Sequence, residues 1–195
     1  FMNPVLNKNT YFVKEHTGIF KAANNYDIYD ESGQNLLIEC REENLSFLTK
    51  LFRFSDLKRT TPFNLEIRTP MGEVLFRVQR GISFFISTVE VFDGRNELLG
   101  RFQQKFWSIG GRFDLFDAHN NPVCTLQGNW SSWEFSFHKD GNELASVSKK
   151  WAGMAREIFT SADNYVIKIN QVVPPDSKIR MLILASVLCI DMVLK

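Results

Sequence analysis

The residues with the clearest chemical potential in this sequence are two groups of cations placed among apolar and aromatic side chains. The first group lies in residues 47–59, where the cations are Lys50, Arg53, Lys58 and Arg59 and the apolar residues are Phe47, Leu51, Phe52 and Phe54. The second group places Lys149, Lys150 and Arg156 around Trp151. Cations beside aromatic rings suit an anionic membrane surface, because each cation contributes about 1 kcal/mol near acidic headgroups and the rings settle at the interface.

Each group also has a purely structural interpretation. Residues 47–59 could form a short amphipathic turn over one end of the fold, with Phe52 and Phe54 inward and the cations solvated. Residues 149–156 could be a solvated bend in which Trp151 closes the end of the fold. Trp130 and Trp133 are expected to pack, with a place at a membrane interface as the alternative. The sequence leaves these alternatives open.

Catalytic chemistry has little support. His16, His119 and His138 are far apart in the chain, and the last two fall in or beside predicted turns. The sequence has no nucleophile elbow, no glycine-rich phosphate loop before a helix and no ligand pair with zinc spacing. We therefore expect the turn histidines His119 and His138 to be solvated, and we expect no cofactor and no enzymatic activity.

Charge and cysteine content narrow the partners and the compartment. The formal net charge of +1 lacks the basic excess of a duplex-DNA binder, so a nucleic-acid partner is not expected. Cys40, Cys124 and Cys189 are odd in number and each lies beside apolar residues, which predicts buried free thiols in a reducing compartment. Because residues 1–4 do not open a secretory signal, we expect a cytoplasmic location, peripheral on the inner membrane face.

The elements that must position these groups are repeated hairpins. An apolar–polar–apolar strand pattern begins five times, at Tyr26, Leu65, Val89, Phe113 and Phe135. Turn sequences rich in Asp, Asn and Gly follow each copy, and these residues supply the positive-φ positions that tight hairpins need. Because many short antiparallel strands must close on themselves or leave exposed edges, the pattern predicts a closed barrel.

The C-terminal segment is predicted to be a helix buried in that barrel. Pro174 and Pro175 end the preceding strand, and Asp176 or Ser177 can cap a helix that begins at Lys178. Residues 181–190 are apolar except for Ser186, so the helix has no polar face. Ten residues extend about 15 Å, whereas a bilayer core is about 30 Å thick. Burial among the strands is therefore preferred to a membrane span, and it leaves little room for a small-molecule cavity.

Several motifs together resemble the phospholipid scramblase family, within the tubby-like and LURP-one-related superfamily. They are residues 17–20, 25–28, 33–34, 112–117, 149–153, 156–160, 162–164 and 182–192, which read TGIF, NYDI, GQ, RFDLFD, KKWAG, REIFT, ADN and LILASVLCIDM. The resemblance covers residues 11–195 as one domain after a lead of residues 1–10. It implies a barrel of about twelve antiparallel strands around a hydrophobic C-terminal helix.

The resemblance also implies function. It favours a peripheral module that binds phospholipid or anionic membrane surfaces and is linked to transbilayer phospholipid movement, with phosphorylated headgroups bound near Lys149, Lys150 and Arg156. The alternative is a non-enzymatic regulatory module of the tubby or LURP-one type that binds protein or nucleic acid.

Two of the family's features are altered in this chain. Residues 161–168 stand where the family has a proposed calcium loop. Asp163 is the candidate ligand and the only carboxylate there, although calcium needs several, so we expect a turn rather than a metal site. Residues 41–44 (REEN) replace the family's palmitoylated cysteine cluster and leave Cys40 alone.

Overall fold

The computed structural model describes residues 2–16, 25–42, 62–81, 88–104, 112–129, 132–149 and 164–194. In chain order, its elements are η1 (Pro4–Asn7), β1 (Thr10–Glu15), β2 (Tyr26–Tyr29), β3 (Leu36–Glu42), β4 (Phe63–Arg68), β5 (Val74–Arg80), β6 (Thr88–Asp93), β7 (Leu98–Gln104), β8 (Arg112–Asp117), β9 (Pro122–Asn129), β10 (Glu134–Lys139), β11 (Asn142–Ser148), β12 (Asn164–Ile169) and α2 (Lys178–Leu194).

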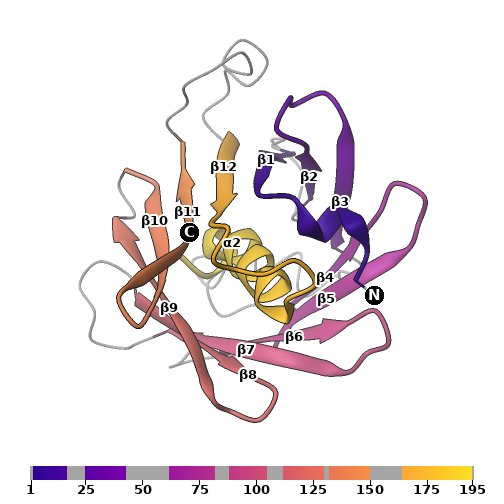
Figure 1. Cartoon of the computed structure of the whole chain (residues 1–195). Coiled ribbons are helices and arrows are strands. Elements are labelled where there is room, and N and C mark those ends of the chain that lie inside the picture. Colours follow the sequence, from indigo (N-terminus) through magenta and orange to yellow (C-terminus); the bar gives the residue numbers. More distant parts are fainter. Residues whose placement is uncertain are drawn as a thin grey trace.

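The twelve strands form one closed antiparallel barrel (Figure 1). Each strand pairs with the next strand in the sequence, and β1 closes the barrel by pairing with β12. Closure leaves no unpaired sheet edge, which a short-stranded antiparallel sheet would otherwise expose. The closed barrel predicted from the hairpin pattern is therefore confirmed, as are the twelve strands that the family resemblance implies.

The two ends of the barrel differ in their connections. At the end we call the turn end, short turns join β2 to β3, β4 to β5, β6 to β7, β8 to β9 and β10 to β11. At the opposite end, which we call the loop end, the odd-numbered strands finish and the even-numbered strands begin. The segments of residues 43–61 and 150–163 both depart from the loop end and return to it, because they join β3 to β4 and β11 to β12.

The tight turns use the residue types that the sequence analysis singled out. Backbone φ is positive at Gly33, Gly72, Asn96, Asn120 and Gly141. These residues tolerate the left-handed region that tight hairpins require. The local turn chemistry therefore accounts for the hairpin positions.

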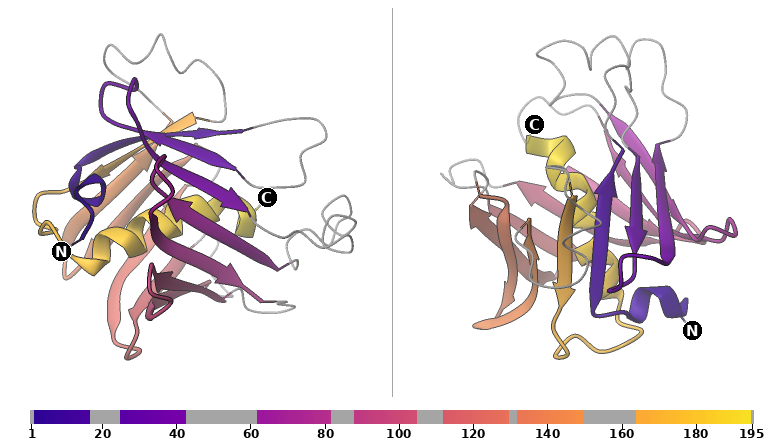
Figure 2. Two further views of the ribbon diagram at one scale, coloured as in Figure 1. Left: turned by 90° about the vertical axis from the view of Figure 1, so that its right-hand side faces the viewer. Right: turned by 90° about the horizontal axis from the view of Figure 1, so that it is seen from above.

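Helix α2 begins at the turn end and runs through the barrel interior, so that its C-terminus lies at the loop end (Figure 2). Every residue from Met181 to Ile190 is at most 6% exposed. Ser186, the polar exception, donates its hydroxyl proton to the carbonyl of Leu182 (2.7 Å), so it is buried without an unmet hydrogen bond. The predicted buried C-terminal helix is confirmed.

The N-terminus of α2 is capped and anchored. The Ser177 hydroxyl accepts a hydrogen bond from the Ile179 amide (3.3 Å), which makes Ser177 the cap. Asp176 instead bonds to Asn7: the Asp176 amide donates to Asn7 Oδ1 (2.9 Å), and Asn7 Nδ2 donates to Asp176 Oδ1 (3.1 Å). The paired hydrogen bonds between Asp176 and Asn7 therefore hold the start of α2 against η1.

Gly100 lets α2 lie close to β7. A Cβ atom at this position would stand 2.2 Å from the Phe116 carbonyl oxygen and 3.1 Å from the Leu182 side chain. Only a residue without a side chain fits between the helix and the strand. The interior is correspondingly tight: the gap lined by Phe102, Phe113 and Ser186 is too narrow to admit a water molecule.

Candidate functional site

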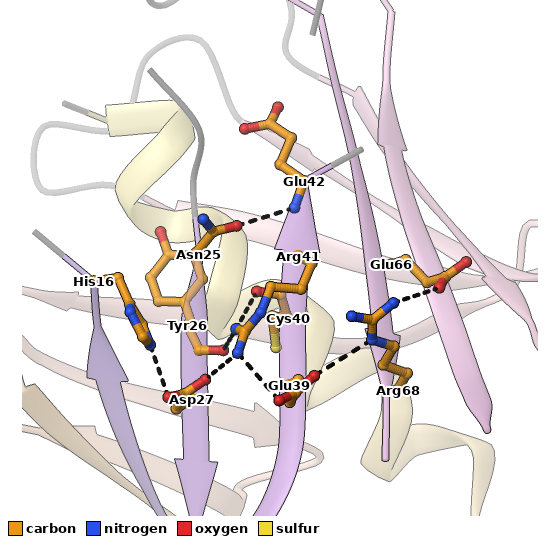
Figure 3. A network of polar contacts seen from close by, with 10 residues as sticks. All are labelled: His16, Asn25, Tyr26, Asp27, Glu39, Cys40, Arg41, Glu42, Glu66 and Arg68. Carbon is orange, nitrogen blue, oxygen red and sulfur yellow. Dashed lines mark hydrogen bonds and ion pairs between the residues drawn. The ribbon is translucent and has the colours of Figure 1, made fainter. Parts of the chain in front are cut away.

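A network of ion pairs crosses the outer face of strands β1 to β4 (Figure 3). Its centre is Asp27, whose carboxylate lies 2.6 Å from Arg41 Nη2 and 2.7 Å from His16 Nε2. Arg41 continues to Glu39 (3.4 Å), and Glu39 continues to Arg68 (3.4 Å). Outward-pointing residues of neighbouring strands meet in this way because successive side chains alternate between the two faces of a sheet.

The network continues to β5 and ends with its charges balanced. Glu66 lies 3.8 Å from Arg68 Nη1 and 3.1 Å from Arg77 Nη2. Three arginines therefore alternate with three carboxylates, and each arginine has a carboxylate within ion-pair distance. Each such pair contributes roughly 0–1 kcal/mol to stability. The network supports the strand pairing, and its three arginines carry no excess positive charge over its three carboxylates.

The network also fixes the end of the β2–β3 pair from which residues 43–61 depart. Arg41 Nη1 donates to the carbonyls of Tyr26 (2.8 Å) and Cys40 (3.0 Å). The Glu42 amide donates to Asn25 Oδ1 (3.3 Å), as Figure 3 shows. The last described residue before the first basic group is therefore held in place.

An aromatic cluster with a cation over it stands at the loop end, where β10, β11 and β12 lie side by side. Trp133 stacks on Tyr165, with ring centroids 5.6 Å apart and an interplanar angle of 27°. Phe135 meets the Trp133 ring edge-on at 5.7 Å. Lys149 Nζ stands 4.3 Å from the centroid of the Trp133 ring. We call these four residues the Trp133 cluster.

The backbone of Trp133 is unusual. Its φ is +53°, in the left-handed region that bulky residues rarely occupy. Strain of this kind is tolerated when the surroundings dictate it, and it is concentrated at functional positions. Here the stack on Tyr165 and the contact with Lys149 hold the half-buried ring at the rim of the barrel. An indole ring with a cation over it, at a rim, is an arrangement suited to a polar–apolar boundary.

The structure describes one of the predicted site residues. Lys149 is in the Trp133 cluster. Lys50, Arg53, Lys58, Arg59, Lys150, Arg156 and Asp163 lie outside the described residues. Both basic groups nevertheless belong to segments that start and finish at the loop end.

The sequence analysis missed both the stack and the network. Trp133 and Tyr165 are 32 positions apart, and only the pairing of β12 with β11, and of β11 with β10, brings them together. The contact of His16 with Asp27 was not predicted either. A prediction of strand register would have been needed to find either contact.

The other titratable groups offer little for catalysis. His138 Nε2 lies 2.7 Å from the Ser136 hydroxyl, whereas the nearby Asp114 accepts a hydrogen bond from Thr125 (3.1 Å). Within the described part of the chain, no three His, Cys, Asp or Glu side chains are grouped as metal ligands would be. The pKa of Cys124 is raised to about 12 by burial, so its thiol stays protonated at neutral pH.

Comparison with known proteins identifies the family. The family model described as Scramblase matches residues 7–194. The chain belongs to the scramblase family. One similar protein is a phospholipid scramblase family protein of Schizosaccharomyces pombe, 26% identical over 159 residues. Another is altered inheritance rate of mitochondria protein 25 of Saccharomyces cerevisiae, 25% identical over 177 residues.

These alignments cover 76% and 77% of this scramblase-family chain but only 41% and 53% of the two yeast proteins. The chain thus spans about half the length of the two curated relatives. An X-ray structure of an Arabidopsis thaliana protein matches the whole of this chain and 98% of its own, with a TM-score of 0.59 and 16% identity. At that identity the match bears on the fold alone. Among the described residues, no helix has both the length and the hydrophobicity needed to cross a bilayer.

Proposed function

We propose that this chain is a peripheral phospholipid-binding module and that its loop end faces anionic membrane surfaces. The observation that carries the proposal is the Trp133 cluster, in which Lys149 is held over a half-buried indole at the rim of the barrel. Membership of the scramblase family points to phospholipid as the class of ligand. Indole rings with a polar edge partition to the membrane interface, which makes this rim a natural contact surface.

The distribution of charge also favours the loop end as the membrane-binding surface. The arginines of the outer network are paired with carboxylates, so those arginines offer little net attraction to acidic lipid. The two basic segments and Lys149 are instead all connected to the loop end. At about 1 kcal/mol per cation, Lys149 alone gives marginal binding, whereas the seven candidate cations acting together would give about 7 kcal/mol.

The buried helix sets a limit on the proposal. Residues 181–190 of α2 are enclosed by the strands, and among the described residues the gap beside the helix at Phe102, Phe113 and Ser186 does not admit a water molecule. Membrane contact through the rim requires no opening of the barrel. Surface binding is therefore the activity proposed for the chain alone, and transbilayer movement would need a further conformational change.

Vesicle co-sedimentation tests the proposal. We expect the chain to sediment with phosphatidylserine-containing vesicles at low salt, but neither with pure phosphatidylcholine vesicles nor at high salt, because the attraction is screened over about 10 Å at 0.1 M salt. No sedimentation with anionic vesicles at low salt would rule the proposal out.

Charge-matched variants locate the binding surface. Lys149→Gln is expected to weaken binding about fivefold, the equivalent of about 1 kcal/mol. Lys168→Gln removes the same charge from an exposed position within β12, away from the Trp133 cluster, and should leave binding unchanged. Equal losses in the two variants would show that net charge, rather than the loop end, determines binding.

A further inference from the structure

One of the three histidines of the chain lies at the loop end, which is the end proposed above to meet the membrane. His16 directly follows β1, which finishes at that end. His119 lies in the turn between β8 and β9, and His138 lies next to the last residue of β10, so both belong to the turn end. Because histidine is the side chain that ordinarily changes its charge between pH 5 and pH 8, His16 is the natural place for a proton-dependent effect at the loop end.

The strand register places His16 beyond the Trp133 cluster in the direction of the membrane. Val13 of β1 pairs with Tyr165 of β12, on which the Trp133 ring is stacked. His16 is three residues farther along the chain towards the loop end, which is about 10 Å at about 3.3 Å per residue. A membrane surface that reaches the Trp133 cluster therefore reaches His16 as well.

The backbone and the ring of His16 are both held in place. Its amide donates to the carbonyl of Asn25 (2.9 Å), which extends the pairing of β1 with β2 by one residue. Its Nε2 atom lies 2.7 Å from Asp27 Oδ2, and its side chain is nevertheless 32% exposed. A proton gained by the ring is therefore fixed in position on a side chain that solvent still reaches.

The Asp27 carboxylate already has an arginine partner. Its Oδ1 atom lies 2.6 Å from Arg41 Nη2, and the three carboxylates of the outer network equal its three arginines in number. A proton on His16 therefore adds one positive charge in excess of the carboxylates of the network.

The other charged groups near His16 do not change this result. Within the described residues, those that β1, β2 and β3 place around it are Lys14, Glu15, Asp27, Glu39, Arg41 and Glu42. On the β12 side, the residue opposite Lys14 is the neutral Asn164. The ordinary pKa values of Asp, Glu, Lys and Arg lie outside the range from pH 5.5 to pH 8.0. Whatever these neighbouring charges sum to, protonation of His16 changes the sum by +1.

We propose that protonation of His16 strengthens the binding of the loop end to anionic membranes. The inference rests on the membrane-binding function proposed above, and it adds a proton-dependent cation to the same surface. One cation near acidic headgroups contributes about fivefold in affinity, the equivalent of about 1 kcal/mol. Binding is therefore tighter at pH 5.5 than at pH 8.0.

Proton binding and membrane binding are linked at this position. Because a proton on His16 favours the membrane-bound state, membrane binding favours the proton by the same factor. Mixing the chain with anionic vesicles in weakly buffered solution at pH 6.5 should therefore take up protons, and the His16→Gln variant should take up fewer. Equal proton uptake by the two chains would contradict the proposal.

Vesicle co-sedimentation at two pH values tests the inference directly. Phosphatidylglycerol is the anionic lipid, because its phosphate is ionised at both pH 5.5 and pH 8.0. We expect the unmodified chain to bind about fivefold more tightly at pH 5.5. Equal binding at the two pH values would overturn this inference alone, whereas no binding at either pH would overturn the proposed function as well.

Two substitutions at position 16 fix the charge in opposite states. His16→Gln keeps a hydrogen-bond donor for Asp27 but gains no charge, so its affinity should stay at the pH 8.0 level of the unmodified chain. His16→Arg is charged throughout, and at pH 8.0 it should bind about as tightly as the unmodified chain does at pH 5.5. Damage to the fold would not produce that gain.

His119→Gln is the matched control, because it removes a histidine from the turn end. It should retain the full pH dependence, and circular dichroism at both pH values checks that each variant is folded. Loss of the pH dependence in His119→Gln, or its persistence in His16→Gln, would overturn the assignment to His16.

Discussion

Arg180 shows how a single charged residue can be accommodated inside the barrel. It is 1% exposed and donates four hydrogen bonds to neutral oxygens. The acceptors are the carbonyls of Pro174 (3.0 Å), Lys8 (2.8 Å) and Val173 (2.8 Å) and the side chain of Asn9 (2.9 Å). One guanidinium thus joins the start of α2 to residues 8–9, which connect η1 to β1.

Arg180→Met is expected to lower the free energy of unfolding by about 2–4 kcal/mol, because buried oxygens lose charge-assisted donors. Urea denaturation should show a lower midpoint with an unchanged slope. The control, Arg95→Met, alters an exposed arginine and should shift stability by no more than about 0.5 kcal/mol. If Arg180→Met lowered the free energy of unfolding by only about 0.5 kcal/mol, as in the control, the guanidinium would not anchor the helix.

The thiols give a second prediction at the residue scale. All three cysteines are free and buried, as the sequence analysis predicted. Burial raises the pKa of Cys40 and Cys189 well above the ordinary value and that of Cys124 to about 12, so the reactive thiolate is scarce at about pH 8. With Ellman's reagent we expect three thiols to react in denaturant and none in the folded protein. Rapid reaction of a native thiol would contradict this burial.

At the scale of elements, individual hairpins could be predicted from the sequence, but the register between neighbouring strands could not. The hairpin beginning at Phe113 could be predicted, because alternation and an Asn-rich turn are encoded within a few residues. The pairing of Glu39 with Arg68 depends on the register of β3 against β4, across a gap of 29 positions. The sequence indicates that both side chains point outward, but only the assembled sheet shows that they meet.

The contact between α2 and β7 yields a prediction at this scale. Gly100→Ala should destabilise the protein by about 1–3 kcal/mol, since the new methyl group would collide with the Phe116 carbonyl and crowd Leu182. Gly81→Ala is the matched control, because nothing lies within 4 Å of a Cβ atom there. Urea unfolding of both variants measures the difference. Equal stability of the two would show that α2 does not pack closely on β7.

For the whole molecule, enclosure of α2 separates membrane binding from lipid movement. Lipid crossing a bilayer needs a polar path for its headgroup, and in the described part of the chain the barrel interior is occupied by the buried, mostly apolar residues 181–190 of α2. We therefore expect the chain alone, reconstituted with vesicles, to give little transbilayer movement of fluorescent phospholipid in a dithionite assay, with or without calcium. Rapid calcium-dependent movement would require the barrel to open.

The end of the barrel that meets the membrane can be identified by spin labelling. Spin labels attached at Lys149→Cys and at Arg95→Cys report the two ends separately, because the native thiols are buried. On anionic vesicles, the label at position 149 should become more accessible to oxygen and less accessible to a water-soluble nickel chelate, whereas the label at position 95 should not change. Immersion of position 95, with position 149 left in water, would contradict the proposed orientation.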